Sequence, residues 1–147
     1  MIRDVGLLIL RLAGIYLALG HGWGKLVGLA SGQSRFVEGV ASMGFPAPLV
    51  FAWAAALAEF VGGLCVALGL FTRWAAAFAA FNMFVACFVR HRALSQFLSW
   101  LGVAPASEDA LKAWGNPELA FTYFVIMLGV ALVGPGALSL DAKVGRK

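Results

Sequence analysis

Long apolar stretches, each bounded by charged or turn-forming residues, dominate the hydrophobic pattern of this chain. A helix needs about 20 predominantly apolar residues to cross the hydrocarbon core of a bilayer, and lipid permits no unpaired backbone groups. Four stretches approach this length, at about residues 5–27, 49–70, 74–92 and 118–133. The pattern therefore predicts an all-α fold, in which residues 1–147 form a single domain built as a four-helix transmembrane bundle.

The segments between these stretches predict how the spans are connected. After the first stretch, Phe36, Val40 and Met43 recur at helical spacing beside charged residues, so we expect a short helix lying in the membrane interface. The turn GLFTRW separates the second stretch from the third, and GPG ends the fourth before a basic tail. Residues 93–116 contain the apolar fragment LSQFLSWLGV, which is too short to span and is expected to lie on the surface.

Composition supports a membrane protein rather than a soluble one. Hydrophobic residues make up 62% of the chain and charged residues only 12%, whereas about a quarter of the residues in a soluble domain are charged. So few charges cannot cover a water-facing surface, and we expect the chain to be embedded in a lipid bilayer. The net charge of +4 comes mostly from residues at the ends of apolar runs, where they contact lipid headgroups, so it does not indicate nucleic-acid binding.

Four spans would place both termini on the same side of the membrane. Basic residues are equally numerous on the two predicted sides, so the positive-inside rule does not choose an orientation. Those on the side of the termini, which include Lys143, Arg146 and Lys147, lie in short segments. We therefore predict a multi-pass protein with cytoplasmic termini.

Motifs for covalent, metal or redox chemistry are missing from the sequence. Cys65 and Cys87 lie inside apolar runs and form neither a CxxC pair nor a metal-ligand spacing. The pattern contains no haem-ligand, flavin or dinucleotide fingerprint. We therefore predict no metal site and no intrinsic cofactor, and the sequence leaves both the catalytic residues and the question of enzymatic activity open.

Polar residues inside the predicted spans fall mainly in one half of the membrane. A charge at membrane depth costs about 3 kcal/mol on insertion scales, so it requires a partner or a cavity. Alternating helix directions bring most of these groups to the side of the longest loop, with Glu59 near the bilayer centre and Arg11 in the opposite half. The candidates for ligand binding or proton handling are Glu59, His21, Lys25, Arg11, Glu118, His91 and Asn82.

Each candidate also has a simpler interpretation. Lys25 and Glu118 lie near helix ends, where they could be interfacial anchors. The histidines could be satisfied by backbone carbonyl groups or by water. Glu59 could form a structural salt bridge with Arg11 or Lys25 as readily as it could handle protons.

A series of motifs resembles the DoxX family of small bacterial membrane proteins. From about Gly6 to Asp141 the chain carries RLAG, HGWGKL, E-x-x-G-G-L, LGLFTR, PELA and GPGALSLD in that order. The resemblance implies a four-helix bundle in the bacterial inner membrane. Carried over by position, it also implies that the family's characteristic polar residues are Arg11, His21, Lys25, Glu59, Arg73, Glu118 and Asp141.

The same resemblance suggests a function. Some DoxX relatives are small subunits of thiosulfate:quinone oxidoreductases, and others are linked to membrane complexes that detoxify oxidants. This implies an accessory subunit of a membrane oxidoreductase, with a polar pocket in one half of the membrane for a quinone or a similar small molecule, and with the redox centre in a partner. Two alternatives stay open: a carrier of a small solute or lipid, which dimerisation through small-residue helix faces would suit, and a purely structural or assembly subunit.

Overall fold

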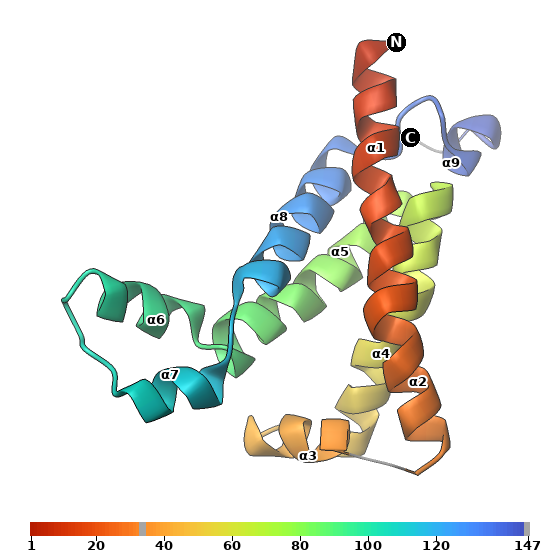
Figure 1. Ribbon diagram of the computed structural model, residues 1–147. Helices are drawn as coiled ribbons and strands as arrows, with labels where there is room; N and C mark the ends of the chain where they lie inside the picture. The colour runs from red at the N-terminus through yellow and green to blue at the C-terminus, as the bar shows by residue number, and fades with distance from the viewer. Residues whose placement is uncertain (33–34, 146–147) are drawn as a thin grey trace.

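The computed structural model describes residues 1–32 and 35–145, and within these ranges every regular element is a helix (Figure 1). The all-α prediction is therefore confirmed. Two of the elements, η1 and η2, are π-helical segments that continue neighbouring α-helices. In chain order the elements are α1 (Ile2–Tyr16), η1 (Leu17–Gly22), α2 (Trp23–Ala30), α3 (Arg35–Ser42), α4 (Pro48–Leu68), α5 (Thr72–Phe84), η2 (Val85–Arg90), α6 (Ala93–Trp100), α7 (Glu108–Trp114), α8 (Glu118–Val133) and α9 (Leu140–Lys143).

The four predicted stretches all lie in helices. The first corresponds to α1, η1 and α2, which follow one another without a break, and the others correspond to α4, to α5 with η2, and to α8. In the described part of the chain, Pro48–Leu68 and Thr72–Arg90 are each long and apolar enough to cross a membrane. A third candidate arises if α8 is joined to α7, from which it is bent by 46°. Two or three spans are thus supported, and the four-helix transmembrane bundle stays a prediction.

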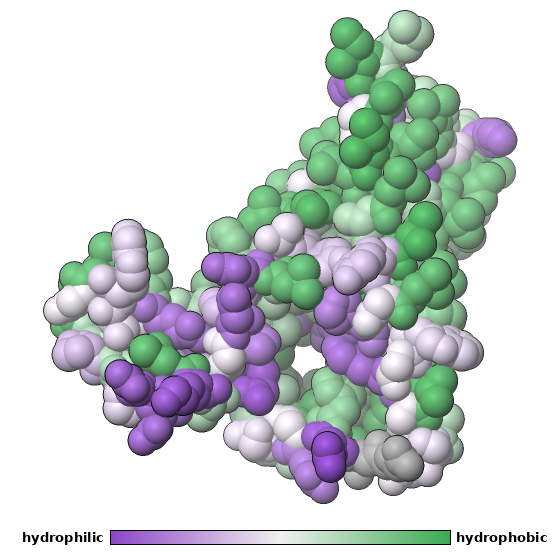
Figure 2. Space-filling view, in the orientation of Figure 1, coloured by the Kyte–Doolittle hydropathy of each residue, from purple (hydrophilic) through white to green (hydrophobic). Residues whose placement is uncertain are grey.

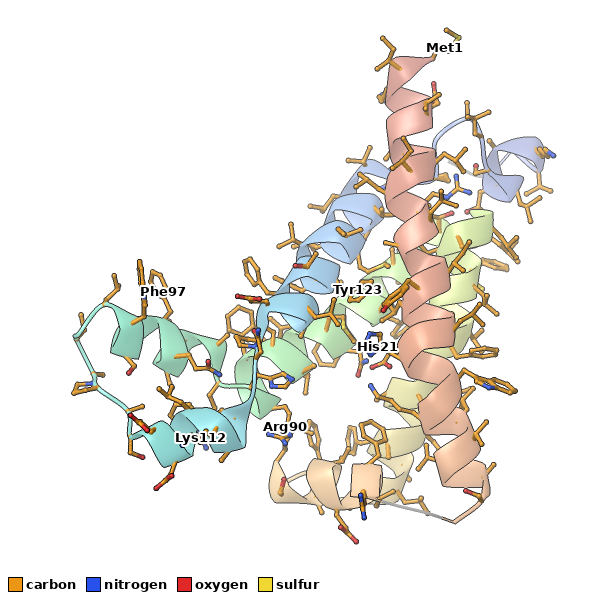
Figure 3. All side chains as sticks on the ribbon, in the orientation of Figure 1. Met1, His21, Arg90, Phe97, Lys112 and Tyr123 are labelled. Atoms are coloured by element: carbon orange, nitrogen blue, oxygen red, sulfur yellow. The ribbon has the colours of Figure 1, made fainter. Side chains whose placement is uncertain are left out.

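Helix packing is tight at one end of the molecule and open at the other. The helices α5 and α8 pack along each other, and α1 packs along α4. At the end near the chain termini, buried Leu17, Val66, Ala76 and Met127 join these pairs in one apolar core. Towards the other end the two pairs diverge (Figure 1). Met1 marks the first end, and Arg90 and Lys112 lie towards the second (Figure 3).

Glycines bring α1 and α4 into backbone contact. A Cβ atom on Gly63 would lie 2.6 Å from the carbonyl oxygen of Gly14 and 3.1 Å from the Cβ of Ala18. Backbones can approach this closely only where the residues at the crossing point have no side chain or a very small one, as is common between membrane helices. The crossing point of these two helices is therefore set by small residues.

Short helices surround the open end. The helix α3 lies where a short connecting helix was predicted, and its Val40 packs with Leu29, Ala52 and Ala56 of the adjoining helices. Its position in the membrane interface stays a prediction. The helices α6 and α7 project sideways as an arm (Figure 1). Arg146 and Lys147 of the predicted basic tail lie outside the described residues.

Candidate functional site

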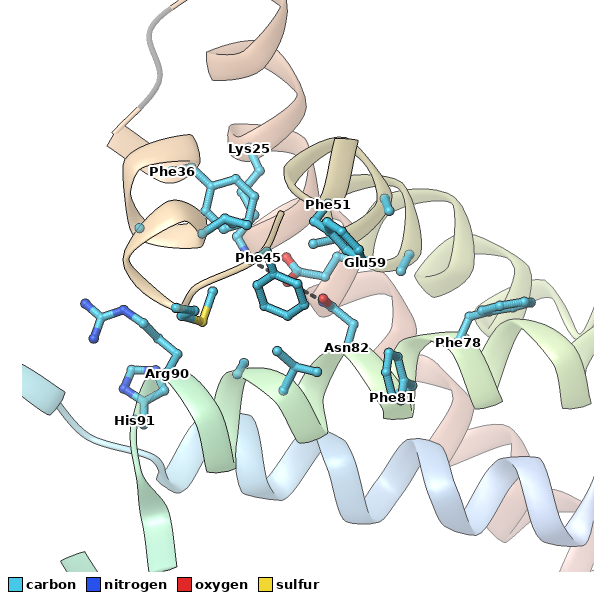
Figure 4. Close-up of a pocket in the computed structure, with 18 residues that line it drawn as sticks. Lys25, Phe36, Phe45, Phe51, Glu59, Phe78, Phe81, Asn82, Arg90 and His91 are labelled. Carbon is cyan, nitrogen blue, oxygen red and sulfur yellow. Dashed lines mark hydrogen bonds and ion pairs between the residues drawn. The ribbon is translucent and has the colours of Figure 1, made fainter. Parts of the chain in front are cut away.

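A cavity of about 500 Å³ lies at the open end, between α3, α4 and the α5–η2 helix. Hydrophilic residues gather around a hollow in this half of the molecule, whereas the other half is almost wholly apolar (Figure 2). Most of the cavity wall is apolar, and its aromatic members are Phe36, Phe45, Phe51, Phe78 and Phe81 (Figure 4). Its polar members are Lys25, Glu59, Asn82, Arg90 and His91. The cavity is therefore amphipathic.

Glu59 is the centre of the polar wall. Its side chain is only 1% exposed, and its Oε1 atom pairs with Nζ of Lys25 and accepts a hydrogen bond of 2.9 Å from Nδ2 of Asn82. These contacts join α2, α4 and α5, and Figure 4 shows them at the edge of the cavity. Of the two partners proposed for Glu59 from the sequence, Lys25 forms the salt bridge.

The second carboxylate oxygen of Glu59 is buried and has no hydrogen-bond partner within residues 1–32 and 35–145. Among the described residues, no donor lies within hydrogen-bond distance of Oε2. Leaving a buried polar atom unsatisfied costs about 1–3 kcal/mol, and more for a charged group, so such atoms usually have a protein, water or ligand partner. Glu59 therefore lines the cavity with a carboxylate whose hydrogen bonding is incomplete within the described residues, although Oε2 itself is shielded from solvent.

Arg90 and His91 connect the cavity wall to α7. The Nδ1 atom of His91 lies 2.6 Å from the carbonyl oxygen of Trp114, and because a carbonyl oxygen only accepts, Nδ1 donates. Arg90 is exposed and donates to the carbonyl oxygen of Ala113 at 3.4 Å. His91 thus follows the simpler interpretation, in which a backbone carbonyl group satisfies the ring.

His21 and Glu118 lie outside the described cavity wall. The His21 ring packs edge-on to Tyr16 and Tyr123, with 6.0 Å between ring centroids in each case, and Figure 3 shows His21 beside Tyr123. Glu118 is exposed at the start of α8 and accepts a hydrogen bond from Asn116. The structure therefore brings Lys25, Glu59 and Asn82 together but leaves these two candidates apart.

Arg11 lies at the opposite, tightly packed end. Arg11 is 2% exposed, and its guanidinium group donates four hydrogen bonds of 2.8–2.9 Å to carbonyl oxygens. The acceptors are Val66 and Ala67 near the end of α4, and Pro135 and Leu138 in the loop after α8. Arg11 therefore holds this loop onto α1 and α4, far from the cavity wall.

Two further residues implied by the family resemblance also connect elements at this end. Asp141 accepts hydrogen bonds from the backbone N–H and hydroxyl groups of Thr72, at 2.8 and 2.7 Å, and so caps α5. Arg73 donates to the carbonyl oxygens of Ala131 and Leu132, at 3.0 and 2.8 Å, and so satisfies the last turn of α8. Arg11, Arg73 and Asp141 thus connect helices and loops at this end of the molecule.

Asp4 links the loop after α8 to the start of α1. Its Oδ1 atom accepts a hydrogen bond of 3.0 Å from the backbone N–H of Ala137. This bond, together with the terminal ammonium group of Met1, lowers the pKa of the Asp4 carboxyl group, which precedes the first predicted span. The sequence analysis did not single out Asp4.

The π-helical segments are features that the sequence pattern did not predict. In η2 the wider turn contributes Val85, Ala86 and Arg90 to the cavity wall, and η1 carries His21. Such segments occur frequently at functional sites because the extra residue re-aims the neighbouring side chains.

Metal ligation finds no support in the described ranges. Within residues 1–32 and 35–145, no group of three or more His, Cys, Asp or Glu side chains lies close enough together to hold a metal ion. Cys65 and Cys87 are both free thiols.

Comparison with known proteins agrees with the motif pattern. The DoxX family model matches residues 6–92. The chain is similar to the inner membrane protein YqjF of Escherichia coli K12, at 31% identity over 146 residues, 99% of this chain and 97% of that protein. It is also similar to the inner membrane protein YphA of the same organism, at 28% identity over 141 residues, 96% and 91% of the respective chains. No solved structure matches the chain.

Proposed function

Because this chain belongs to the DoxX family and is an inner membrane protein, we propose that it crosses the membrane as a four-helix bundle and binds a small amphipathic molecule, a quinone or a close analogue, beside Glu59. It acts as an accessory subunit of a membrane oxidoreductase, and the partner enzyme contains the redox centre. The termini face the cytoplasm, and the cavity opens towards the opposite side.

One observation carries this proposal: a buried carboxylate with an unpaired oxygen forms part of the wall of an otherwise apolar, aromatic cavity. Ligand pockets are typically about 300–1,000 Å³ in volume, mostly apolar, with a few polar groups that orient the ligand. The cavity of about 500 Å³ falls within this range. A quinone has a flat apolar ring with oxygen atoms at its edge, and this pattern matches the distribution of groups in the wall.

The roles of the chain's own residues are binding and orientation. The phenylalanines contact the faces of the ring and exclude water, and the ammonium group of Lys25 donates a hydrogen bond to a ring oxygen. Asn82 holds the Glu59 carboxylate in place through its bond to Oε1. A bound quinone would carry electrons and protons, which it would exchange with the partner enzyme.

The proposal is tested by ligand-dependent stability. The purified protein in nanodiscs is heated with short-tailed ubiquinone or menaquinone, each in its oxidised and its reduced form. A ligand at about 100 times its Kd should raise the free energy of unfolding by about 2.7 kcal/mol. The variant Ala55→Phe, which places a ring in the cavity, should lose this stabilisation, whereas Ala77→Phe, on α5 outside the cavity wall, should keep it.

The opposite result favours an architectural role. If neither redox form of either compound stabilises the wild-type protein, alone or with its native partner, the ligand proposal fails. The contacts among Lys25, Glu59 and Asn82 would then serve only to join α2, α4 and α5, as expected for a structural or assembly subunit.

A further inference from the structure

The two carboxylate oxygens of Glu59 differ in their hydrogen bonding. Oε1 has two donors, Lys25 and Asn82, whereas Oε2 has none among the described residues, although the side chain is 1% exposed. A carboxylate oxygen only accepts hydrogen bonds. Whatever completes this part of the wall must therefore bring a donor.

Charge at the site is already balanced. The ammonium group of Lys25 pairs with Glu59 and lies 4.8 Å from the centroid of the Phe36 ring. A cationic ligand at Oε2 would place a second positive charge beside Lys25 in a site of low dielectric constant, where like charges repel strongly. A neutral donor avoids this repulsion. Lys25 has three N–H groups, so it can also donate to a ligand oxygen.

We infer that the cavity selects a neutral ligand with a hydroxyl group on its ring, a hydroquinone rather than a quinone. This inference rests on the proposed function. After a small rotation of the buried carboxylate that turns Oε2 to the cavity, one hydroxyl group donates to Oε2 of Glu59 and accepts from Lys25 with the same oxygen atom. A quinone carbonyl group only accepts, so it uses Lys25 and leaves Oε2 without a partner.

The rest of the cavity wall does not distinguish the hydroquinone from the quinone. Phe45 and Phe51 pack together with 4.6 Å between ring centroids, and with Phe78 and Phe81 they present apolar surface to the cavity. The two redox forms of one compound share the same ring substituents and tail, so these contacts contribute nearly equally to both. Sites that hydrogen-bond a ligand hydroxyl discriminate strongly against analogues without it, because their polar groups are left unpaired. Glu59 therefore determines the preference for the hydroquinone over the quinone.

The experiment compares three forms of one short-tailed ubiquinone: the quinone, the hydroquinone, and the dimethyl ether of the hydroquinone, which keeps the oxygens but has no O–H donor. Kd values are measured by calorimetry with protein in nanodiscs under anaerobic conditions. For the wild-type protein we expect the hydroquinone to bind about 10-fold more tightly than either of the others, or better.

Two variants test the assignment to Glu59. In Glu59→Gln an amide N–H group replaces the accepting Oε2, so the ratio of the Kd values for quinone and hydroquinone should fall at least about 10-fold. The variant Glu118→Gln makes the same chemical change at an exposed position outside the cavity wall and should keep the wild-type ratio. If Glu59→Gln does not fold, the comparison of hydroquinone with dimethyl ether on the wild-type protein decides the question.

The outcomes separate this inference from the proposed function. Equal binding of the three forms, or tighter binding of the quinone, would overturn the hydroquinone preference while leaving the quinone-type ligand proposal intact. A hydroquinone preference that Glu59→Gln keeps would overturn the assignment to Glu59. Binding of none of the forms would overturn the proposed function itself.

Discussion

Two buried charges in this molecule are satisfied in different ways. Arg11 is buried and donates four of its five N–H groups to carbonyl oxygens, so that each of its three nitrogen atoms has a partner. Glu59 is equally buried, but only one of its oxygens has partners among the described residues. At the residue scale, a charge with a partner at every nitrogen atom fits an architectural role, whereas an incompletely bonded carboxylate beside a cavity is where we propose that a ligand binds.

A substitution of Arg11 tests the architectural assignment. Lysine keeps the charge but not the planar fork that reaches both α4 and the loop after α8. Because bonds from a charged donor are each worth about 1.5–3 kcal/mol, Arg11→Lys should lower the free energy of unfolding by about 3 kcal/mol. Denaturant-induced unfolding in detergent micelles measures this change.

The control for Arg11 is Arg3→Lys, at an exposed position of the same helix, which should change stability by less than about 0.5 kcal/mol. The affinity of folded Arg11→Lys protein for cavity ligands should be unchanged, because Arg11 is absent from the described wall. A loss of affinity without a loss of stability would contradict the architectural role.

At the scale of elements, the closest helix contact and the cavity lie at different ends of the molecule. Gly14 and Gly63 meet where α1 crosses α4, and the core of α5 and α8 packs nearby. Beyond this point the helix pairs diverge, and η2 and α3 contribute to the cavity wall (Figure 1). The close crossing depends on the absence of side chains at Gly14 and Gly63.

A pair of glycine substitutions tests this dependence. In Gly63→Ala the new methyl group would meet the backbone of α1, so the helices must separate, and overpacking of this kind costs about 1–3 kcal/mol. In Gly129→Ala on α8 the methyl group has nothing within 4 Å, and stability should be almost unchanged. Thermal unfolding of the two variants provides the comparison, and equal stability would contradict a close crossing.

At the scale of the whole molecule, polarity is distributed asymmetrically along the long axis. The end that carries Met1 and α9 is tightly packed and has a mostly apolar surface, whereas the end that carries α3, α6 and α7 has more polar surface and contains the cavity (Figure 2). In a four-span arrangement these ends face opposite sides of the membrane. A ligand would then enter the cavity from one side only.

Cysteine labelling tests this arrangement. Single cysteines are introduced as Ala104→Cys, in the loop between α6 and α7, and as Lys143→Cys, in α9. With cytoplasmic termini, a membrane-impermeant maleimide added to spheroplasts should label Ala104→Cys directly and Lys143→Cys only after the membrane is disrupted. The unsubstituted protein, with its natural Cys65 and Cys87, provides the background. Labelling of both variants from the same side would contradict four crossings, and the reversed pattern would contradict the orientation alone.

The sequence by itself determined the helical class of this protein and the half of the molecule in which its polar groups gather. Both depend on local properties: apolar stretches of sufficient length form helices, and alternating helix directions place Lys25, Arg90 and His91 at one end. These features need no knowledge of which helices touch.

Only the tertiary structure decided which polar groups meet. It pairs Glu59 with Lys25 instead of Arg11, turns His21 towards Tyr16 and Tyr123, and leaves Glu118 exposed. These outcomes depend on how far each helix is rotated and where it crosses its neighbours, and the contacts of glycines and the π-helical turns set both. Residues far apart in the chain make those contacts, so a pattern read along one helix cannot contain them.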